Sequence, residues 1–209
     1  MIGVLGGTFD PIHYGHLRPA REVFDHLGLA RLHLIPAAAP PHRKPPLATA
    51  AQRLRMVEIA VTEFPGFVAD DREIRRGGVS YTVPTLEALR AGIGDAPLCF
   101  LLGTDAFAGL PSWYRWEQLF ELAHLVVMQR PGAAASIPAW AAARVCSGRE
   151  SIAARPAGAV VFVPVTPRDI SATQLRAAIA RGETPSADVL PPAVWDYIER
   201  LHLYRSSAA

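Results

Sequence analysis

Residues 6–16, GGTFDPIHYGH, gather glycines, a threonine, an aspartate and two histidines in one short stretch. An apolar run precedes them and a helical pattern follows, so the stretch joins a strand to a helix, where open parallel sheets bind ligands. Glycine lets the backbone approach a ligand, and a helix N-terminus offers free N–H groups to an anion. His13 and His16 are three positions apart, so in a helical turn both imidazoles face the same way. The stretch predicts a phosphate-binding loop.

A surface turn and a zinc site are the alternatives for this loop. In the first, the glycines make a tight turn and the histidines are simply exposed. In the second, His13, His16 and Asp10 ligate a metal, although the chain has no HExxH motif and neither cysteine supports such a site. The stretch is neither GxGxxG nor GxxxxGK[ST], and no such string occurs elsewhere in the chain.

Residues 170–176, ISATQLR, carry a second group of donors. Ser171 followed by Gln174 predicts a capping box, and therefore a helix start. Arg176 in the first two turns is unfavourable beside the helix dipole unless an anion is also present. Thr173 and Arg176 lie three positions apart on one helix face, which predicts a second binding site for a polyphosphate. The alternative is an ordinary capped helix with Thr173 and Arg176 on its surface.

The pattern of apolar residues predicts alternating strands and helices. Apolar runs indicate strands at residues 1–5, 32–36, 97–103, 124–132 and 159–165. Helical spacing indicates helices at 15–27, 50–64, from about 84, 172–180 and 193–201. We therefore expect an α/β fold, a Rossmann-like doubly wound, mainly parallel sheet with helices on both faces. Residues 1–209 are expected to form one domain, with a small helical part from about residue 171; the alanine-rich stretch 133–158 shows no chemistry.

Composition limits the partners and the compartment. The net charge of +2 over 209 residues is too small to predict general binding to nucleic acid or a membrane surface. No run of about 18 apolar residues occurs, so no spanning helix is expected. Cys99 and Cys146 form no disulfide framework, which favours the reducing cytoplasm. The oligomeric state is left open, a homo-oligomer included.

The two donor-rich motifs resemble the signatures of the nucleotidylyltransferase superfamily. Three further strings resemble the bacterial nicotinate-nucleotide adenylyltransferases: IPAAAPPHRK at 35–44, SYTVPTLEALR at 80–90, and residues 100–132 from FLLGTD through LPSWY to QRPG. Pro84 departs from the pattern, since the family usually has aspartate there. The resemblance covers nearly the whole chain outside 133–158 and the C-terminal tail.

The resemblance implies adenylyl transfer from ATP to nicotinate mononucleotide, giving deamido-NAD and pyrophosphate. Mg²⁺ would arrive on the ATP phosphates, and no metal site made by the protein itself is implied. Asp105 would accept from ribose hydroxyls (or else cap a helix), Trp113 would stack on the pyridine ring, and backbone N–H groups of Thr85 and Tyr114 would bind the nicotinate carboxylate. The implied residues are His13, His16 and Arg176 for catalysis; Gly7, Thr8, Phe9, Gly103, Thr104, Asp105, Ser171 and Thr173 for ATP; and His42, Arg43, Lys44, Thr85, Trp113 and Tyr114 for the mononucleotide.

Other functions share part of this pattern. An adenylyl- or cytidylyltransferase for phosphopantetheine, choline phosphate or nicotinamide mononucleotide would carry the same first loop. A non-catalytic nucleotide-binding regulator would bind ATP without turnover. RNA binding is disfavoured by the low net charge.

Overall fold

A computed structural model describes residues 1–40, 45–129 and 137–205 of the chain. Its centre is a six-stranded sheet in which every pairing is parallel, with the order β3-β2-β1-β4-β5-β6. The strands are β1 (Ile2–Gly7), β2 (Arg31–Pro36), β3 (Phe67–Ala69), β4 (Leu98–Gly103), β5 (His124–Gln129) and β6 (Val160–Pro164). The predicted Rossmann-like sheet is confirmed, and the strand order reverses between β1 and β4, where such sheets bind ligands.

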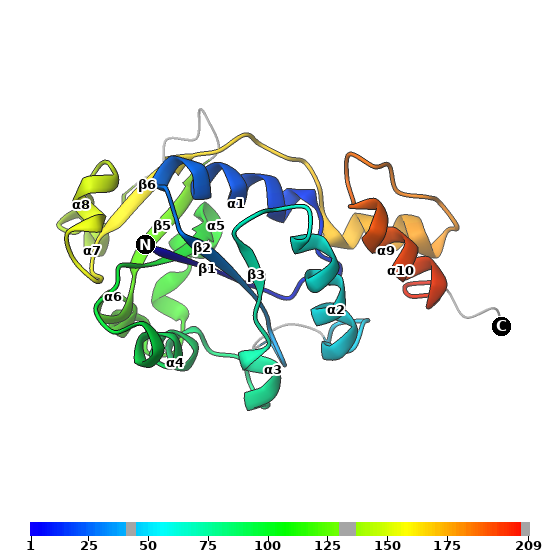
Figure 1. Cartoon of the computed structure of the whole chain (residues 1–209), viewed down its shortest axis with the longest axis horizontal. Helices are drawn as coiled ribbons and strands as arrows, with labels where there is room; N and C mark the ends of the chain where they lie inside the picture. The colour runs from blue at the N-terminus through cyan, green and yellow to red at the C-terminus, as the bar shows by residue number, and fades with distance from the viewer. Residues whose placement is uncertain (41–44, 130–136, 206–209) are drawn as a thin grey trace.

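Helices cover both faces of this sheet, as the sequence predicts (Figure 1). One apolar cluster holds buried residues of α1 (Tyr14–Leu27), α2 (Ala50–Val61) and α8 (Arg149–Ala153). The opposite cluster holds those of α4 (Thr82–Ile93), α5 (Thr104–Ala108), α6 (Leu119–Leu122) and α7 (Ala139–Ala142). Along β4, Cys99 and Leu101 face the first cluster while Phe100 and Leu102 face the second. The central strands are thus buried on both sides, which explains their continuous apolar runs.

The first helix is nearly the one expected. Leu17, Ala20, Val23 and Leu27 are buried at helical spacing. Gly28 follows with φ +60°, a left-handed conformation that glycine adopts easily, and ends the helix. The helix begins at Tyr14, one residue before the expected start, with His13 as its extended N-cap.

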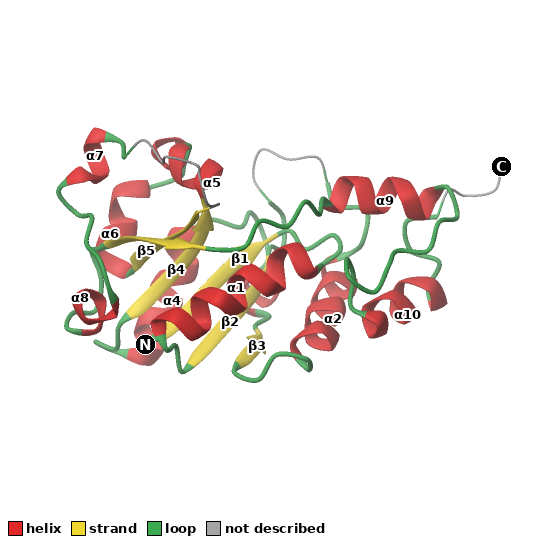
Figure 2. Ribbon diagram, turned by 90° about the horizontal axis from the view of Figure 1, so that it is seen from above, coloured by secondary structure: helices red, strands yellow, loops and turns green. Residues whose placement is uncertain are grey.

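The C-terminal helices lie beyond the end of the sheet. Figures 1 and 2 show α9 (Ala172–Ala180) and α10 (Pro192–Arg200) at this end of the molecule, and α10 packs against α2. The predicted range 172–180 matches α9, and 193–201 matches α10 within one residue. Several elements were not predicted because they are too short to show a period: β3, α3 (Arg72–Arg76), α5 to α8, and the 3₁₀ turns η1 (Leu110–Ser112) and η2 (Trp116–Gln118).

Candidate active site

A buried arginine side chain binds the backbone of the loop after β1. Arg53 is 1% exposed, and its guanidinium donates to the carbonyls of Thr8 (2.7 Å) and Ala38 (3.1 Å). Burying this cation is tolerable because backbone oxygens accept hydrogen bonds from its N–H groups.

Gly7 allows the loop to pack closely. Phe9 has φ +49°, and a Cβ on Gly7 would come within 2.7 Å of the Phe9 ring. The glycine is therefore needed for the close packing of this loop.

His13 and His16 meet at the start of α1, as predicted, although His13 is the N-cap rather than a residue of the first turn. Their rings stack with centroids 3.8 Å apart and planes 25° apart. Burial and the neighbouring His16 lower the pKa of His13 to about 2, and burial lowers the pKa of His16 to about 4. Both rings are therefore neutral at pH 7, and the Nδ1 atom of each is buried without a partner in the described part of the chain.

Gly15 makes room for this pair. A Cβ there would approach the His13 ring to 2.9 Å and the Cβ of Ile170 to 3.1 Å. Ile170 is the first residue of the ISATQLR motif, two positions before α9 begins, so this close approach also places the second donor-rich motif against the first. Gly15 is therefore needed because a larger residue would collide with the His13 ring and with Ile170.

The second motif reaches the loop through Arg176. Its Nη1 donates to the carbonyl oxygen of Asp10 at 2.7 Å, and its Nη2 donates to Thr173 Oγ1 at 3.3 Å. Thr173 and Arg176 do share one face, as expected, and that face meets the phosphate loop. The guanidinium thus joins two segments that are far apart in the sequence.

The predicted capping box at α9 is wrong. Ser171 is the N-cap, but its side chain makes no capping hydrogen bond. The N–H groups of the first helical residues, Ala172 to Gln174, have no acceptor among the described residues. A complete box does occur at α2, where Thr49 and Gln52 cap each other's backbone. The start of α9 is left with unpaired donors, as an anion-binding helix end requires.

A cavity of about 660 Å³ opens at the carboxyl edge of the sheet. It brings together five predicted residues: His16, Gly103, Thr104, Asp105 and Trp113. Asp105 is exposed in the first turn of α5 and does not cap that helix, since Gly103 is the N-cap. Trp113 is half-buried with one edge against Phe100, at 6.2 Å between ring centroids.

Sequence reasoning missed part of the cavity wall. Met128 at the end of β5 and residues 165–168 after β6 also line it. The Nε atom of Arg168 is buried without a partner among the described residues. These positions lie at the carboxyl end of β5 or directly after β6. Both strands were predicted, so the rule that ligands bind at the carboxyl ends of parallel strands could have indicated them.

The other predicted residues lie around this cavity or away from it. The cavity is not lined by Gly7, Thr8, Phe9, His13, Ser171, Thr173 or Arg176. His13 and Phe9 contact its wall through the ring of His16, and Arg176 contacts the loop at Asp10. Thr85 is buried in α4 with its hydroxyl 2.5 Å from Glu73 Oε1, and Tyr114 is exposed beside Tyr81. Their assignment to the mononucleotide stays a prediction. His42, Arg43 and Lys44 lie outside the described residues.

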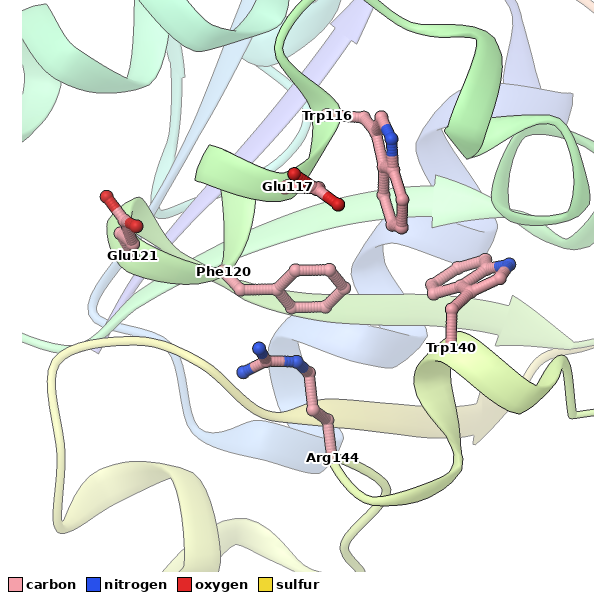
Figure 3. A pocket seen from close by; sticks show the side chains of 6 residues that line it. All are labelled: Trp116, Glu117, Phe120, Glu121, Trp140 and Arg144. Atoms are coloured by element: carbon pink, nitrogen blue, oxygen red, sulfur yellow. The ribbon is translucent and has the colours of Figure 1, made fainter.

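A smaller hollow of about 400 Å³ lies between η2, α6 and α7 (Figure 3). Trp116, Phe120 and Trp140 form its walls, and Arg144 lies over the Phe120 ring, 4.5 Å from its centroid. Glu117 and Glu121 complete the lining. Among the described residues, its lining contains neither a histidine nor any predicted site residue.

In the described part of the chain, no group of three or more histidine, cysteine, aspartate or glutamate side chains is arranged to hold a metal. No helix in that part of the chain is both long and apolar enough to cross a membrane.

Comparison with known proteins gives the family. A cytidylyltransferase-like family model matches residues 4–178. A relative from Aeromonas hydrophila, named probable nicotinate-nucleotide adenylyltransferase, is 48% identical over 208 residues, 98% of this chain and 97% of its own. A relative of the same name from Halorhodospira halophila is 50% identical over 197 residues, 92% of this chain and 90% of its own.

Solved structures share the fold at much lower identity. The Plasmodium falciparum nicotinic acid mononucleotide adenylyltransferase complexed with NaAD superposes with a TM-score of 0.73 at 18% identity, covering 97% of this chain and 96% of its own. At that identity the likeness concerns the fold alone. The sequence relatives, which match over nearly their whole length, show that this chain belongs to the nicotinate-nucleotide adenylyltransferases within the cytidylyltransferase-like family.

Proposed function

We propose that this chain transfers the adenylyl group of ATP to nicotinate mononucleotide, giving deamido-NAD and pyrophosphate. The observation that carries the proposal is that both donor-rich motifs converge on the loop after β1: His13 and His16 stack at its helical end, Ile170 lies against Gly15, and Arg176 donates to the Asp10 carbonyl. Relatives named for this activity match nearly the whole chain. The donors present suit a polyphosphate, and no covalent intermediate with the protein is required.

The chemistry is an in-line displacement at phosphorus. A phosphate oxygen of the mononucleotide attacks the α-phosphorus of ATP, and the bond to the pyrophosphate breaks. Such a transfer asks the protein mainly to position the reactants and to stabilise charge. The neutral imidazoles of His13 and His16 offer N–H donors, while Arg176 offers a permanent positive charge. The unpaired N–H groups at the start of α9 would face the same phosphates.

The cavity suits the rest of the nucleotide. Its volume of about 660 Å³ falls within the usual range for small-molecule sites, roughly 300–1,000 Å³. Asp105 is exposed at its edge and can accept hydrogen bonds from ribose hydroxyls. Trp113 presents an indole to the same space, and a flat ring suits a pyridine or adenine ring.

Mg²⁺ would enter with ATP rather than on the protein. Magnesium prefers oxygen ligands and often binds through one or two carboxylates plus substrate phosphates. Among the described residues that line the cavity, Asp105 is the carboxylate. We therefore expect phosphate oxygens and water to supply most of the ligands, and pyrophosphate release to require the metal.

Pyrophosphate release from ATP tests the proposal. Nicotinate mononucleotide, nicotinamide mononucleotide, phosphopantetheine and choline phosphate would be compared as acceptors under the same conditions. We expect the highest kcat/KM with nicotinate mononucleotide. Faster turnover of another acceptor would reassign the substrate, and nucleotide binding without turnover of any acceptor would indicate a regulator.

A further inference from the structure

Asp10 in the phosphate loop is bound from several distant parts of the chain. Its side chain is 5% exposed. Oδ1 accepts from the hydroxyl of Tyr204 at 2.8 Å and from the N–H of Ala48 at 3.1 Å, and Oδ2 accepts from the N–H of Leu47 at 2.9 Å. Its backbone carbonyl accepts from Arg176. One residue thus joins the loop, the start of α2, α9 and the C-terminal segment.

Tyr204 follows α10, and its side chain is fixed by burial and by the hydrogen bond to Asp10. It is 9% exposed in the same apolar cluster as α1 and α2. It has φ +64°, a conformation that non-glycine residues adopt only where their surroundings impose it. Burial and the Asp10 carboxylate raise its pKa well above the usual range. The phenol therefore remains a proton donor to Asp10 at every physiological pH.

The Arg176 guanidinium lies between two acceptors of Asp10. Its Nη1 is 2.7 Å from the Asp10 carbonyl oxygen and 3.9 Å from carboxylate Oδ2. In the intact network the carboxylate already accepts three hydrogen bonds, so the guanidinium stays on the carbonyl and beside Thr173. Without the Tyr204 hydroxyl, the buried carboxylate would lack a donor, and the nearby cation would be drawn toward it.

We infer that the Tyr204 hydroxyl is a positioning group for adenylyl transfer: by donating to Asp10 it fixes the phosphate loop and keeps Arg176 directed at the triphosphate. Transfers of this kind are sensitive to displacements of about 1 Å, because the reacting atoms must be aligned. The inference rests on the proposed function for its reaction. The competing interpretation is that Tyr204 only packs the C-terminal helices against the domain.

The test compares two tyrosine-to-phenylalanine variants. Tyr204→Phe removes the hydroxyl and keeps the ring in the core. Tyr197→Phe is the matched control, because Tyr197 lies in α10, packs against the same apolar cluster and makes no hydrogen bond to Asp10. We expect Tyr204→Phe to raise the KM for ATP and lower kcat, reducing kcat/KM by about tenfold. We expect Tyr197→Phe to retain wild-type kinetics.

Coupling to Asp10 separates positioning from packing. If Tyr204 acts through the carboxylate, Tyr204→Phe should change kcat/KM much less in an Asp10→Asn background than in wild type. Wild-type kinetics of Tyr204→Phe with a lowered melting temperature would overturn the inference, as would fully additive effects in the double variant.

A binding measurement keeps this result distinct from the proposed function. Affinity for a non-hydrolysable ATP analogue would be measured by calorimetry for wild type and both variants. If wild type turned over none of the acceptors, the proposed function would fail. The inference would then be judged on affinity alone: weaker binding only in Tyr204→Phe supports it, and equal binding overturns it.

Discussion

His13 and His16 stack face to face with 3.8 Å between ring centroids, and neither Nδ1 has a partner among the described residues. Two imidazolium ions could not remain at that distance in a buried site, so at most one ring of the stack can be charged. Burial lowers the pKa of both residues well below 7, so both rings are neutral at pH 7. The pair therefore offers directed N–H donors rather than fixed charge, and Arg176 supplies the charge.

Replacing His16 by alanine should impair catalysis without unfolding the chain. Loss of one preorganised donor to developing charge typically costs about 10²-fold in kcat. His26, exposed in the last turn of the same helix, provides the control, and His26→Ala should keep full activity. Steady-state pyrophosphate release and a melting curve would check both variants. Near-wild-type turnover in His16→Ala would remove it from the catalytic group.

The histidine pair should also make stability depend on pH. In the unfolded chain each imidazole titrates near 6.5, while in the folded chain the pKa of His16 is about 4 and that of His13 about 2. Between about pH 4 and 6.5 the unfolded state binds more protons, so the free energy of unfolding falls as pH drops through this window. The stabilisation is fully present above about pH 6.5.

Denaturant unfolding at pH 7 and pH 5 would measure this effect. We expect His16→Gln to reduce the difference between the two pH values by on the order of 1 kcal/mol relative to wild type. His26→Gln, altered at an exposed position, should leave the difference unchanged. An identical pH dependence in wild type and His16→Gln would show that His16 titrates normally in the folded protein.

Arg176→Lys should not be conservative. The guanidinium donates from two nitrogens to two acceptors, the Asp10 carbonyl and the Thr173 hydroxyl, and a single ammonium cannot reproduce that fork. We expect kcat/KM for ATP to fall by about tenfold or more. Arg181→Lys, at an exposed arginine paired with Glu183 after the same helix, is the matched control. Unaltered kinetics in Arg176→Lys would place its guanidinium outside the reaction.

Ser171→Ala tests the open start of α9. Because the Ser171 side chain caps nothing, its removal should leave the free energy of unfolding unchanged while raising the KM for ATP. Thr49→Ala should do the reverse, since Thr49 completes a capping box whose loss typically costs about 1 kcal/mol. Unfolding curves and ATP titrations of both variants give a direct comparison. A destabilised Ser171→Ala would restore the capping box that the sequence predicted.

The sequence predicted the helices and strands whose apolar residues repeat at a regular spacing. It did not predict the contacts between residues that lie far apart in the chain. The long helices and the buried strands follow from spacing, and β1 with α1 was placed within two residues at each end. Nothing in the local sequence marks Arg53, whose carbonyl partners come from three separate turns, or Tyr204, whose acceptor lies 194 positions away. The capping box failed because a Ser-x-x-Gln string allows reciprocal hydrogen bonds without requiring them.

Trp113→Ala tests how the site would distinguish nicotinate from nicotinamide mononucleotide. The acid and amide rings have nearly the same shape, so stacking on an indole cannot separate them. A carboxylate only accepts hydrogen bonds whereas an amide NH₂ donates, so selectivity requires protein donors that an amide would leave unpaired. The backbone N–H groups of Thr85 and Tyr114 are the predicted donors.

Wild type should therefore prefer the acid by a large factor, since unpaired buried donors penalise the wrong substrate strongly. Trp113→Ala should lower kcat/KM for both mononucleotides while changing the acid-to-amide ratio much less. Trp116→Ala is the control, because Trp116 is also half-buried but lines the other hollow. The measurement is kcat/KM with each mononucleotide for wild type, Trp113→Ala and Trp116→Ala. Equal efficiency in wild type would contradict the nicotinate assignment, and an unchanged Trp113→Ala would make Trp113 a packing residue.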